Sequence, residues 1–158
     1  MDLAVSMQLN GLSAATQAVE RVAGWDRVEL LETIARLVQL QTRRRIEVEK
    51  TGPNGEAWPE NRNKSSTLYA SGALHDSIDY AIGLGDFTLG SPLIYAAIHH
   101  FGGVIKPKTA KVLRFMAGNK AVYAKSVTMP ARPYLGISPE NAEEIESVVG
   151  DFVQELLQ

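Results

Sequence analysis

The three histidines and several serines are the first residues of this chain to test for catalysis or metal binding. His99 and His100 are adjacent, so on a helix their side chains point about 100° apart. Such a pair cannot hold one metal ion in the way that two histidines four residues apart can. His75 stands beside Asp76, but no further residue in the sequence completes a catalytic set around them. The histidines therefore favour structural or interfacial roles.

The other patterns of catalysis are absent from the sequence. There is no cysteine, which excludes disulfides, thiolate nucleophiles and cysteine-bound metals. The sequence has no P-loop, dinucleotide-binding fingerprint or HExxH pattern, and Ser71, Ser91 and Ser126 lack the context of a nucleophile elbow. We predict that the protein is not an enzyme and holds neither cofactor nor metal. The alternative, an unrecognised hydrolase, requires an apolar pocket in which His99 lies beside a carboxylate.

Charge is sorted along the chain. No acidic side chain lies between Asp86 and Glu140, whereas the residues from Glu140 onwards carry no lysine or arginine. The basic residues of the middle stretch are Lys106, Lys108, Lys111, Arg114, Lys120, Lys125 and Arg132. The acidic residues of the tail are Glu140, Glu143, Glu144, Glu146, Asp151 and Glu155.

This sorting has three interpretations. Two copies could meet basic to acidic, and a head-to-tail contact of that kind repeats into a ring or a filament. The basic stretch of one chain could instead fold back on its own acidic helix. Alternatively, Lys106, Lys108, Lys111, Lys120 and Lys125 could bind the phosphate backbone of a nucleic acid, with Phe115 and Tyr123 stacking on bases. No known nucleic-acid-binding signature accompanies them, and the sequence pI of about 5.9 is low for such a module.

Length and composition predict a single globular domain over residues 1–158. Hydrophobic residues make up 45% and charged residues 22% of the chain, and the net charge of −2 hides the opposed segments. The first residues lack a basic stretch followed by an apolar run, and no later segment is long enough to cross a bilayer. We expect a soluble protein that is cytoplasmic when made and has no membrane partner.

The N-terminal half predicts one strand and two helices. Alternation over residues 3–9 is typical of a half-buried strand, and a short helix is expected over residues 13–23. Asp26 can cap a longer helix over residues 26–49. The arginines at positions 43–45 near its end suit the negative end of the helix dipole, which explains them without a nucleic acid.

The middle of the chain predicts a long loop and several short elements. Glycine and proline mark residues 50–66 as a loop around an exposed Trp58. Ser71 can cap a short helix that ends at Asp76. Strands are expected at residues 78–82 and 87–89, and a short apolar helix at residues 93–101, stopped by Gly102 and Gly103.

The C-terminal half predicts a hairpin and a helix. Residues 112–117 and 121–128 are strand-like, and Gly118 suits a type II′ turn between them. We expect this hairpin, part of an excursion over residues 104–127, to project from the core. Ser138 and Pro139 start an amphipathic helix. The expected fold is α+β: a small, mainly antiparallel sheet packed by the long helix and the C-terminal helix.

A series of short motifs is more specific than any single residue. In order along the chain the motifs are Pro53-Asn54-Gly55 with Trp58, Gly72 and Leu74 with Ser77-Ile78, Gly90-Ser91 with Tyr95-Ala96 and Ile98 to Gly103, and Met129 to Gly136. This series resembles the Mu-like phage virion morphogenesis family, whose members are also called tail completion proteins. The resemblance covers roughly residues 25–158. Asn54, His100 and Tyr134 stand where the family usually has Asp, Gln and Phe.

The resemblance implies a structural protein of a tailed phage or prophage that completes the tail or the head–tail joint. It would assemble in the bacterial host cytoplasm and remain in the virion. Its expected partners are further copies of itself in a ring, taken as a hexamer, other tail or head–tail connector proteins, and DNA in non-specific proximity. As subunit interface we expect Lys106, Lys108, Lys111, Arg114, Lys120, Lys125, Glu143, Glu144, Glu146 and Asp151.

The motif residues themselves are expected to be structural. These are Trp58, Tyr95, His99, Phe101, Gly102, Gly103, Pro130, Arg132 and Pro133. The paired glycines let the chain leave its helix through conformations closed to other residues. Pro130 and Pro133 fix an extended path, and Arg132 between them is expected to lock this segment onto a carboxylate or a carbonyl.

Overall fold

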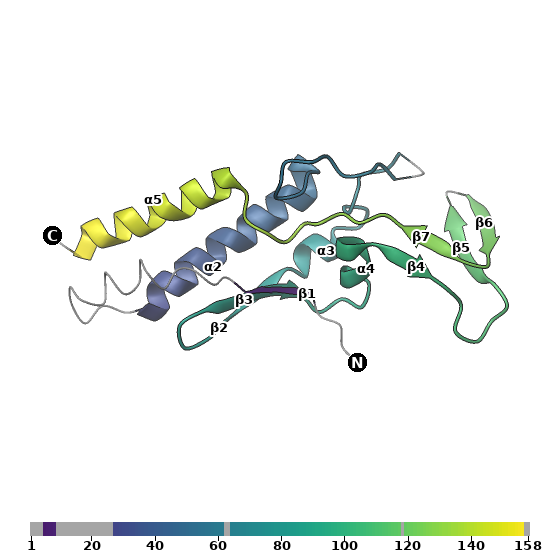
Figure 1. Ribbon diagram of the computed structural model, residues 1–158, viewed down its shortest axis with the longest axis horizontal. Coiled ribbons are helices and arrows are strands. Elements are labelled where there is room, and N and C mark those ends of the chain that lie inside the picture. The colour runs from purple at the N-terminus through teal and green to yellow at the C-terminus, as the bar shows by residue number, and fades with distance from the viewer. Residues whose placement is uncertain (1–4, 9–26, 62–63, 118, 157–158) are drawn as a thin grey trace.

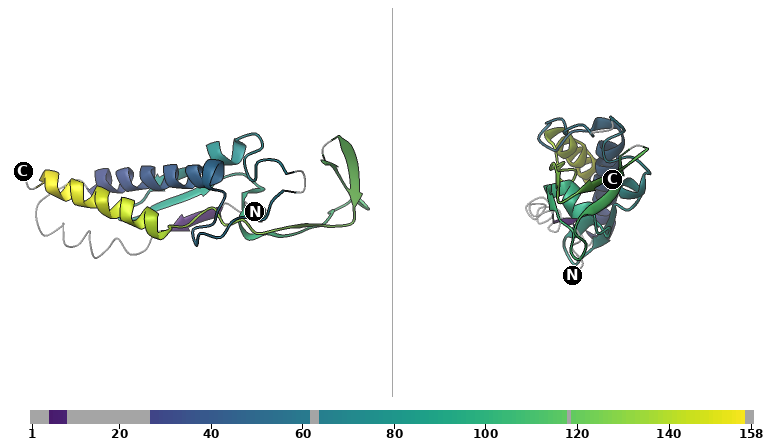
Figure 2. Two further views of the ribbon diagram at one scale, coloured as in Figure 1. Left: turned by 90° about the horizontal axis from the view of Figure 1, so that it is seen from above. Right: turned by 90° about the vertical axis from the view of Figure 1, so that its right-hand side faces the viewer.

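The computed structural model describes residues 5–8, 27–61, 64–117 and 119–156. These residues form an elongated α+β molecule in which two long helices lie toward one end and a narrow β arm projects at the other (Figure 1). Viewed from above, the arm continues the long axis of the body before its tip turns aside (Figure 2). The α+β class expected from the sequence is confirmed.

The long helix forms as expected. Helix α2 spans Arg27–Arg44 and continues as a single π-helical stretch, η1, over Arg45–Glu49. It ends at Lys50, which adopts a left-handed conformation with φ of 58°. The apolar face includes Leu30, Leu31, Ile34 and Val38, all of which are buried in the core. The expected cap, Asp26, and the expected helix over residues 13–23 lie outside the described residues.

A three-stranded antiparallel sheet lies against α2. Its order is β1 (Val5–Gln8), β3 (Phe87–Ser91) and β2 (Asp79–Ile82), so β3 is central. The inward side chains of β3, Phe87 and Leu89, are fully buried. All three strands were expected from alternating apolar residues, and pairing them buries one face under the helix.

Two short helices lie near the root of the arm, and only the second of them leads into it. Helix α3 spans Ala73–Asp76, and the Ser71 hydroxyl accepts a hydrogen bond from the Ala73 amide at 3.4 Å. Helix α4 spans Ala96–Phe101, three residues shorter at its start than expected. The chain leaves α4 through Gly102 and enters the arm directly.

The arm differs from the single hairpin that was expected. Strand β4 (Gly103–Ile105) pairs with β7 (Val127–Met129) to form a two-stranded neck, and β5 (Leu113–Ala117) pairs with β6 (Lys120–Ala124) at the tip. The strand predicted over residues 121–128 is therefore wrong as one element, because it divides near Lys125 into two strands with different partners. The arm projects from the body as predicted (Figure 1). The type II′ turn involves Gly118, which lies outside the described residues.

Helix α5 spans Pro139–Leu156 and begins as predicted, because the Ser138 hydroxyl accepts a hydrogen bond from the Asn141 amide at 3.2 Å. It packs along α2, whereas the sequence analysis placed it on the sheet. Ile145 is buried in the core, and Val149 and Phe152 pack partly against it. A helix can cover another helix as well as a sheet, and its apolar stripe does not distinguish the two.

The prediction that Trp58 is exposed is wrong. Its side chain is only 7% exposed and belongs to the core cluster. Its indole Nε1 donates a hydrogen bond to the carbonyl oxygen of Pro133 at 3.0 Å. Clustered glycine and proline correctly indicated a loop, but they carry no information about which side chain of the loop turns inward.

Candidate functional site

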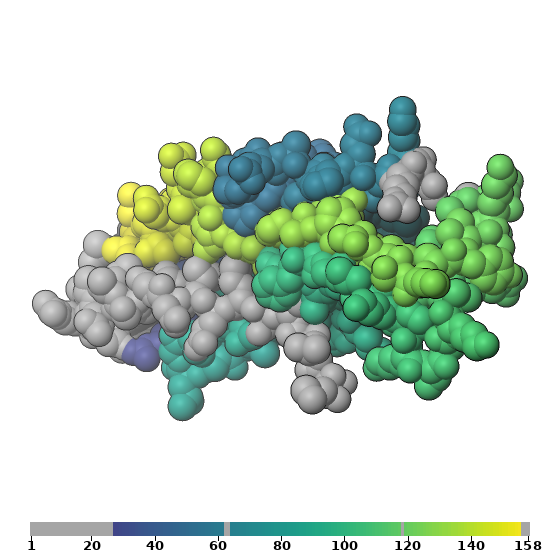
Figure 3. All heavy atoms as spheres, turned by 45° about the vertical axis from the view of Figure 1, so that its right-hand side comes forward, coloured from purple at the N-terminus to yellow at the C-terminus, as the bar shows by residue number. Residues whose placement is uncertain are grey.

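The motif segments that are separated in sequence converge at the root of the arm. Residues 130–136 run in extended form between the loop that follows α2 and the first part of the arm, and the space-filling view shows them in contact on both sides (Figure 3). We call residues 130–136 the strap. Every contact of the strap described below joins two segments far apart along the chain, which explains why the motifs occur as an ordered series.

Arg132 attaches the strap to the loop. Its side chain is 3% exposed, its Nε donates to the carbonyl oxygen of Pro59 at 2.9 Å, and its Nη2 donates to that of Glu60 at 3.3 Å. The expectation that this arginine would bind a carbonyl is thus confirmed. Burial lowers the pKa of Arg132 from its usual value. The prolines on either side, Pro130 and Pro133, leave the strap extended and limit its own hydrogen-bond donors.

Helix α4 attaches to the opposite side of the strap. The Arg132 amide donates to the carbonyl oxygen of His99 at 2.9 Å, and the Tyr134 hydroxyl donates to that of Ala96 at 3.1 Å. The Tyr134 amide donates to Nδ1 of His100 at 3.3 Å. Burial raises the pKa of Tyr134 and lowers the pKa of both histidines, and Arg132 lowers the pKa of His99 further.

The glycines at the end of α4 allow the close approach of the strap. Gly102 has φ of 70° and ψ of −175°, a region that is almost closed to residues with a Cβ. A Cβ at this position would lie 2.6 Å from the Ala131 amide nitrogen. Gly103 also has a positive φ, 146°. The role predicted for these two glycines is confirmed.

Tyr95 and Phe101 stand apart from the other motif residues. Their side chains are 41% and 69% exposed, so they do not belong to the core. Tyr95 lies edge-to-face with His99, and Phe101 lies edge-to-face with His100. These aromatic side chains therefore cover the histidines from outside.

Arg45 is a buried residue of this junction whose role was not predicted from the sequence. Its side chain is 1% exposed, its Nη1 donates to the carbonyl oxygens of Tyr134 and Gly136 at 3.0 Å each, and its Nη2 donates to Oδ1 of Asn141. Burial lowers its pKa. The helix dipole alone explained the arginines at positions 43–45. Three consecutive arginines give no sign of which one is buried in the core and which lie at the surface.

The basic arm is exposed. All six predicted interface residues of the arm are exposed, and within the described ranges none of them forms a salt bridge. They are Lys106, Lys108, Lys111, Arg114, Lys120 and Lys125. Arg132, the seventh basic residue of this stretch, is buried in the junction and contributes nothing to the surface of the arm.

The acidic helix presents a surface of one sign. Glu143, Glu146 and Asp151, all predicted interface residues, are exposed on α5, and so are Glu140 and Glu155. Glu144 differs, because it accepts hydrogen bonds from Gln41 at 2.8 Å and from Arg44 at 3.1 Å within the same chain. These contacts lower its pKa, Gln41 being the larger cause. Glu144 therefore joins α5 to α2.

The basic arm and the acidic helix lie at opposite ends of the long axis (Figures 1 and 2). The interpretation in which the basic hairpin of one chain folds back onto its own acidic helix is therefore wrong. A chain with these two surfaces at opposite ends can pair them only with another molecule.

Comparison with known proteins agrees with the motif series. The sequence model of the phage virion morphogenesis family matches residues 7–154. The chain belongs to this family. It is also similar to the "Mu-like prophage FluMu G protein 2" of Haemophilus influenzae, with 26% identity over 157 residues that cover 98% of this chain and 99% of that protein. No solved structure matches the chain.

Membership of the virion morphogenesis family assigns the chain a part in building phage particles. None of the helices in the described ranges is both long and apolar enough to cross a membrane. Among the same residues, no three histidine, aspartate or glutamate side chains gather in a group that could hold a metal ion.

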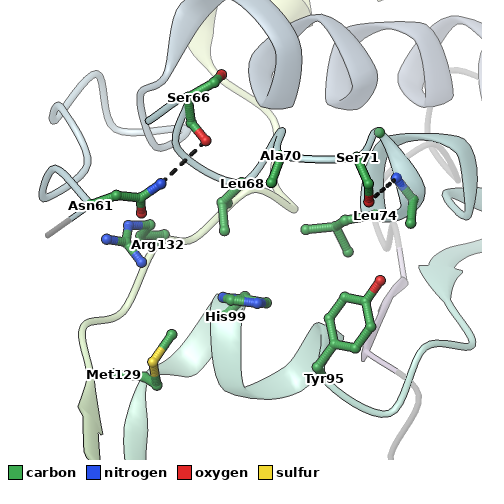
Figure 4. A pocket seen from close by; sticks show the side chains of 12 residues that line it. Asn61, Ser66, Leu68, Ala70, Ser71, Leu74, Tyr95, His99, Met129 and Arg132 are labelled. Carbon is green, nitrogen blue, oxygen red and sulfur yellow. Dashed lines mark hydrogen bonds between the residues drawn. The ribbon is translucent and has the colours of Figure 1, made fainter. Parts of the chain in front are cut away.

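A pocket of about 340 Å³ lies beside the strap of this family member. Figure 4 shows His99 of α4 and Tyr95, which precedes this helix, facing Leu68 and Leu74 across the pocket, with Arg132 at one end. Among the residues that the structure describes, no side chain that lines the pocket is acidic. The hydrolase interpretation requires a carboxylate beside His99, whereas the charged side chain in this described lining is Arg132.

Proposed function

We propose that the protein is a non-enzymatic structural component that completes the phage tail, or the joint between tail and head, by assembling into a ring. The basic arm of each subunit lies on the acidic face of α5 in the next subunit. The observation that carries this proposal is the position of the two oppositely charged surfaces at opposite ends of one elongated chain. Family membership and the Mu-like prophage relative support the setting.

A contact between two different surfaces is heterologous, so each subunit keeps one arm and one helix free for further neighbours. Such contacts close into a ring when the rotation per subunit divides a full turn, and otherwise extend into a filament. A completed tail needs a closed end, which favours the ring, taken here as a hexamer. Complementary charges would speed encounter and suppress contacts between two arms or two helices.

Other partners follow from the same setting. The ring would form in the cytoplasm of the bacterial host and then bind tail or head–tail connector proteins in the virion. A ring at that joint surrounds the path of the DNA, so part of the basic arm would lie near phosphate without reading sequence.

Sedimentation velocity at two salt concentrations tests the ring. At about 50 mM salt the Debye length is above 10 Å and the contact should hold, whereas at about 1 M it falls to roughly 3 Å and the particles should dissociate. Reversing the arm charges with Lys120→Glu and Lys125→Glu should abolish assembly. Mixing that variant with a Glu143→Lys, Glu146→Lys variant should restore a contact between the two chains. A strict monomer at low salt and high concentration would remove the proposal.

A second candidate, nucleic-acid binding by the arm, is supported by the exposure of its unpaired basic side chains. It predicts duplex binding that is micromolar and falls steeply with salt. A gel-shift titration that stays flat at about 50 mM salt would exclude it. The variant with Glu143→Lys and Glu146→Lys separates the two functions, because it should weaken assembly and leave any binding by the arm intact.

A further inference from the structure

The tip of the arm is a two-stranded sheet with apolar side chains outside the core. In the register of β5 and β6, Arg114 pairs with Tyr123 and Met116 pairs with Ala121. Directly paired residues of antiparallel strands point to the same side of the sheet. Met116 is 61% and Tyr123 is 62% exposed. We call Arg114, Met116, Ala121 and Tyr123 the hairpin face; it is apolar in the middle and basic at one end.

A hairpin of two strands is marginally stable by itself in water, and its apolar side chains are stabilised when a third element covers them. None of the apolar residues of β5 and β6 belongs to the core cluster or packs against it. An exposed group of large apolar side chains on a projecting element is characteristic of a binding surface.

The body carries a surface of matching character on α2. Leu40 and Val48 are 56% and 69% exposed, and with Leu37 they line a groove of about 460 Å³ that Glu47 and Glu144 border. We call this the helix groove. It lies on the side of α2 from which Arg44 and Gln41 reach Glu144 of α5.

The start of α5 makes the border of the helix groove acidic. The groove lining itself is balanced, because Arg43 and Arg44 stand against Glu47 and Glu144, and His75 lies beside Glu47. Arg43 donates to the carbonyl oxygens of Asp76 and Ile78, and Arg44 pairs with Glu49 and Glu144. The first turns of α5 add Glu140 and Glu143, which are exposed. Glu140 precedes Glu143 by three residues and Glu144 by four, so Glu140 neighbours both of them on one side of the helix.

We propose that the helix groove of one subunit receives the hairpin face of a second copy of this chain. Met116 and Tyr123 would cover Leu40 and Val48, while Arg114 would meet the glutamates at the start of α5. This inference rests on the proposed ring and deepens it, because it names the apolar residues of a subunit contact that charged residues alone would leave weak. We call this apolar contact between the hairpin face and the helix groove the seat.

The occupant is a second copy for two reasons. First, the hairpin face has a basic end and the helix groove an acidic border, so the two surfaces match in both apolar and charged character. Second, the hairpin of β5 and β6 lies at the far end of the arm, away from α2 and α5 (Figure 1), so the hairpin face of one chain can meet the helix groove of another.

Sedimentation velocity of two paired variants at low salt tests this seat. The hairpin variant carries Met116→Thr and Tyr123→Thr, which place β-branched side chains suited to strands at these positions. The groove variant carries Leu40→Gln and Val48→Gln, which suit a helix. All four side chains are exposed, so both variants should remain folded. Each variant alone should raise the dissociation constant of self-association by roughly tenfold or more.

Mixing the two variants gives the decisive result. Every chain in the mixture retains one intact surface, so a hairpin-intact chain can bind a groove-intact chain once, and the mixture should stop at a dimer of one chain of each kind. The matched controls, Val104→Thr on the arm and Leu84→Gln in the turn between β2 and β3, replace exposed apolar side chains elsewhere and should assemble normally.

The outcomes are distinguishable. If both variants assemble like the unaltered chain while charge reversal on the arm still abolishes assembly, the apolar seat is wrong and the proposed ring stands. If the unaltered chain does not associate at low salt, the ring and the seat fail together. A mixture that associates no more tightly than either variant alone would also overturn the seat, because every pair of unlike chains in the mixture can form one intact contact.

Discussion

Arg132 and Pro59 are 73 residues apart in the chain, yet the guanidinium Nε of Arg132 donates to the Pro59 carbonyl oxygen at 2.9 Å. Beside this bond, Trp58 donates back to Pro133 at 3.0 Å. The two hydrogen bonds run in opposite directions, so the loop and the strap each supply both a donor and an acceptor. This reciprocal contact sets the path of the chain as it returns from the arm to α5.

Replacing Arg132 with methionine should destabilise the protein by about 2–3 kcal/mol, because the carbonyl groups of Pro59 and Glu60 would lose their charged donor. Urea unfolding followed by circular dichroism measures the loss. The control is Arg36→Met on the exposed side of α2, which loses a surface pair with Glu32 and should stay within about 0.5 kcal/mol of the unaltered protein. Equal stabilities of the two variants would contradict the role assigned to Arg132.

Two neighbouring arginines, Arg44 at the end of α2 and Arg45 at the start of η1, should differ sharply in how much they stabilise the protein. Arg45→Met removes three hydrogen bonds from the core, two to backbone carbonyls of the strap and one to Asn141, and should cost about 2–4 kcal/mol. Arg44→Met removes ion pairs whose side chains are largely exposed and should cost at most about 1 kcal/mol. Hydrogen exchange should also show faster opening of α5 in the first variant only. Similar losses in both would mean that burial does not separate the two arginines.

Two glycine-to-alanine changes should shift the free energy of unfolding in opposite directions. Gly102→Ala forces a Cβ to within 2.6 Å of the Ala131 amide at a φ of 70°, and we expect a loss of about 2–4 kcal/mol. Gly150→Ala lies within α5, where no atom comes within 4 Å of the added Cβ, and should stabilise the protein by about 0.5–1 kcal/mol. Thermal unfolding of both variants measures the difference. A tolerated Gly102→Ala would show that the exit from α4 can rearrange.

Stability should fall as the pH drops below about 6.5. The folded state holds the pKa of His99 and His100 below that value, so the unfolded chain binds protons first as acid is added. At higher pH both histidines are neutral in the folded and the unfolded state, so they cause no loss of stability there. Glu140 and Glu144 of α5, whose pKa values are lowered in the folded state, reduce stability only when the pH falls below about 4.5. Chemical unfolding at a series of pH values measures the slope.

His100→Gln provides the control for this pH dependence. A glutamine can still accept the hydrogen bond from the Tyr134 amide through its side-chain carbonyl, but it does not titrate. The unfolding free energy of this variant should therefore change less steeply between about pH 7 and pH 5, the range in which histidines usually titrate. An unchanged slope would exclude His100 as a source of the effect.

Local sequence patterns were enough to predict most of the secondary structure. Alternating residues predicted the strands of the central sheet, and a 3.6-residue period with a Ser138 cap predicted α5. The ordered motifs indicated the family, and the sign of each charged stretch was visible directly. These features depend on neighbours within a few residues, so the sequence alone was enough to predict them.

Other features depended on contacts between distant segments. Three features could be recognised only from their partners in the folded chain. They are the burial of Trp58, the hydrogen bonds from Arg45 to the strap and the division of residues 121–128 between two strands. Glu144 could not be distinguished from the other glutamates of α5 until Gln41 and Arg44 were found beside it.

By itself, then, the amino-acid order determined which elements form, where the chain turns and which stretches carry each charge. Only the tertiary structure decided that the basic arm and the acidic helix lie at opposite ends, which Arg132 and Arg45 at the junction help to set. The physical reason is range: helix and strand formation follow from local backbone and side-chain preferences, whereas the direction in which an arm leaves the body depends on buried hydrogen bonds between segments that only folding brings together.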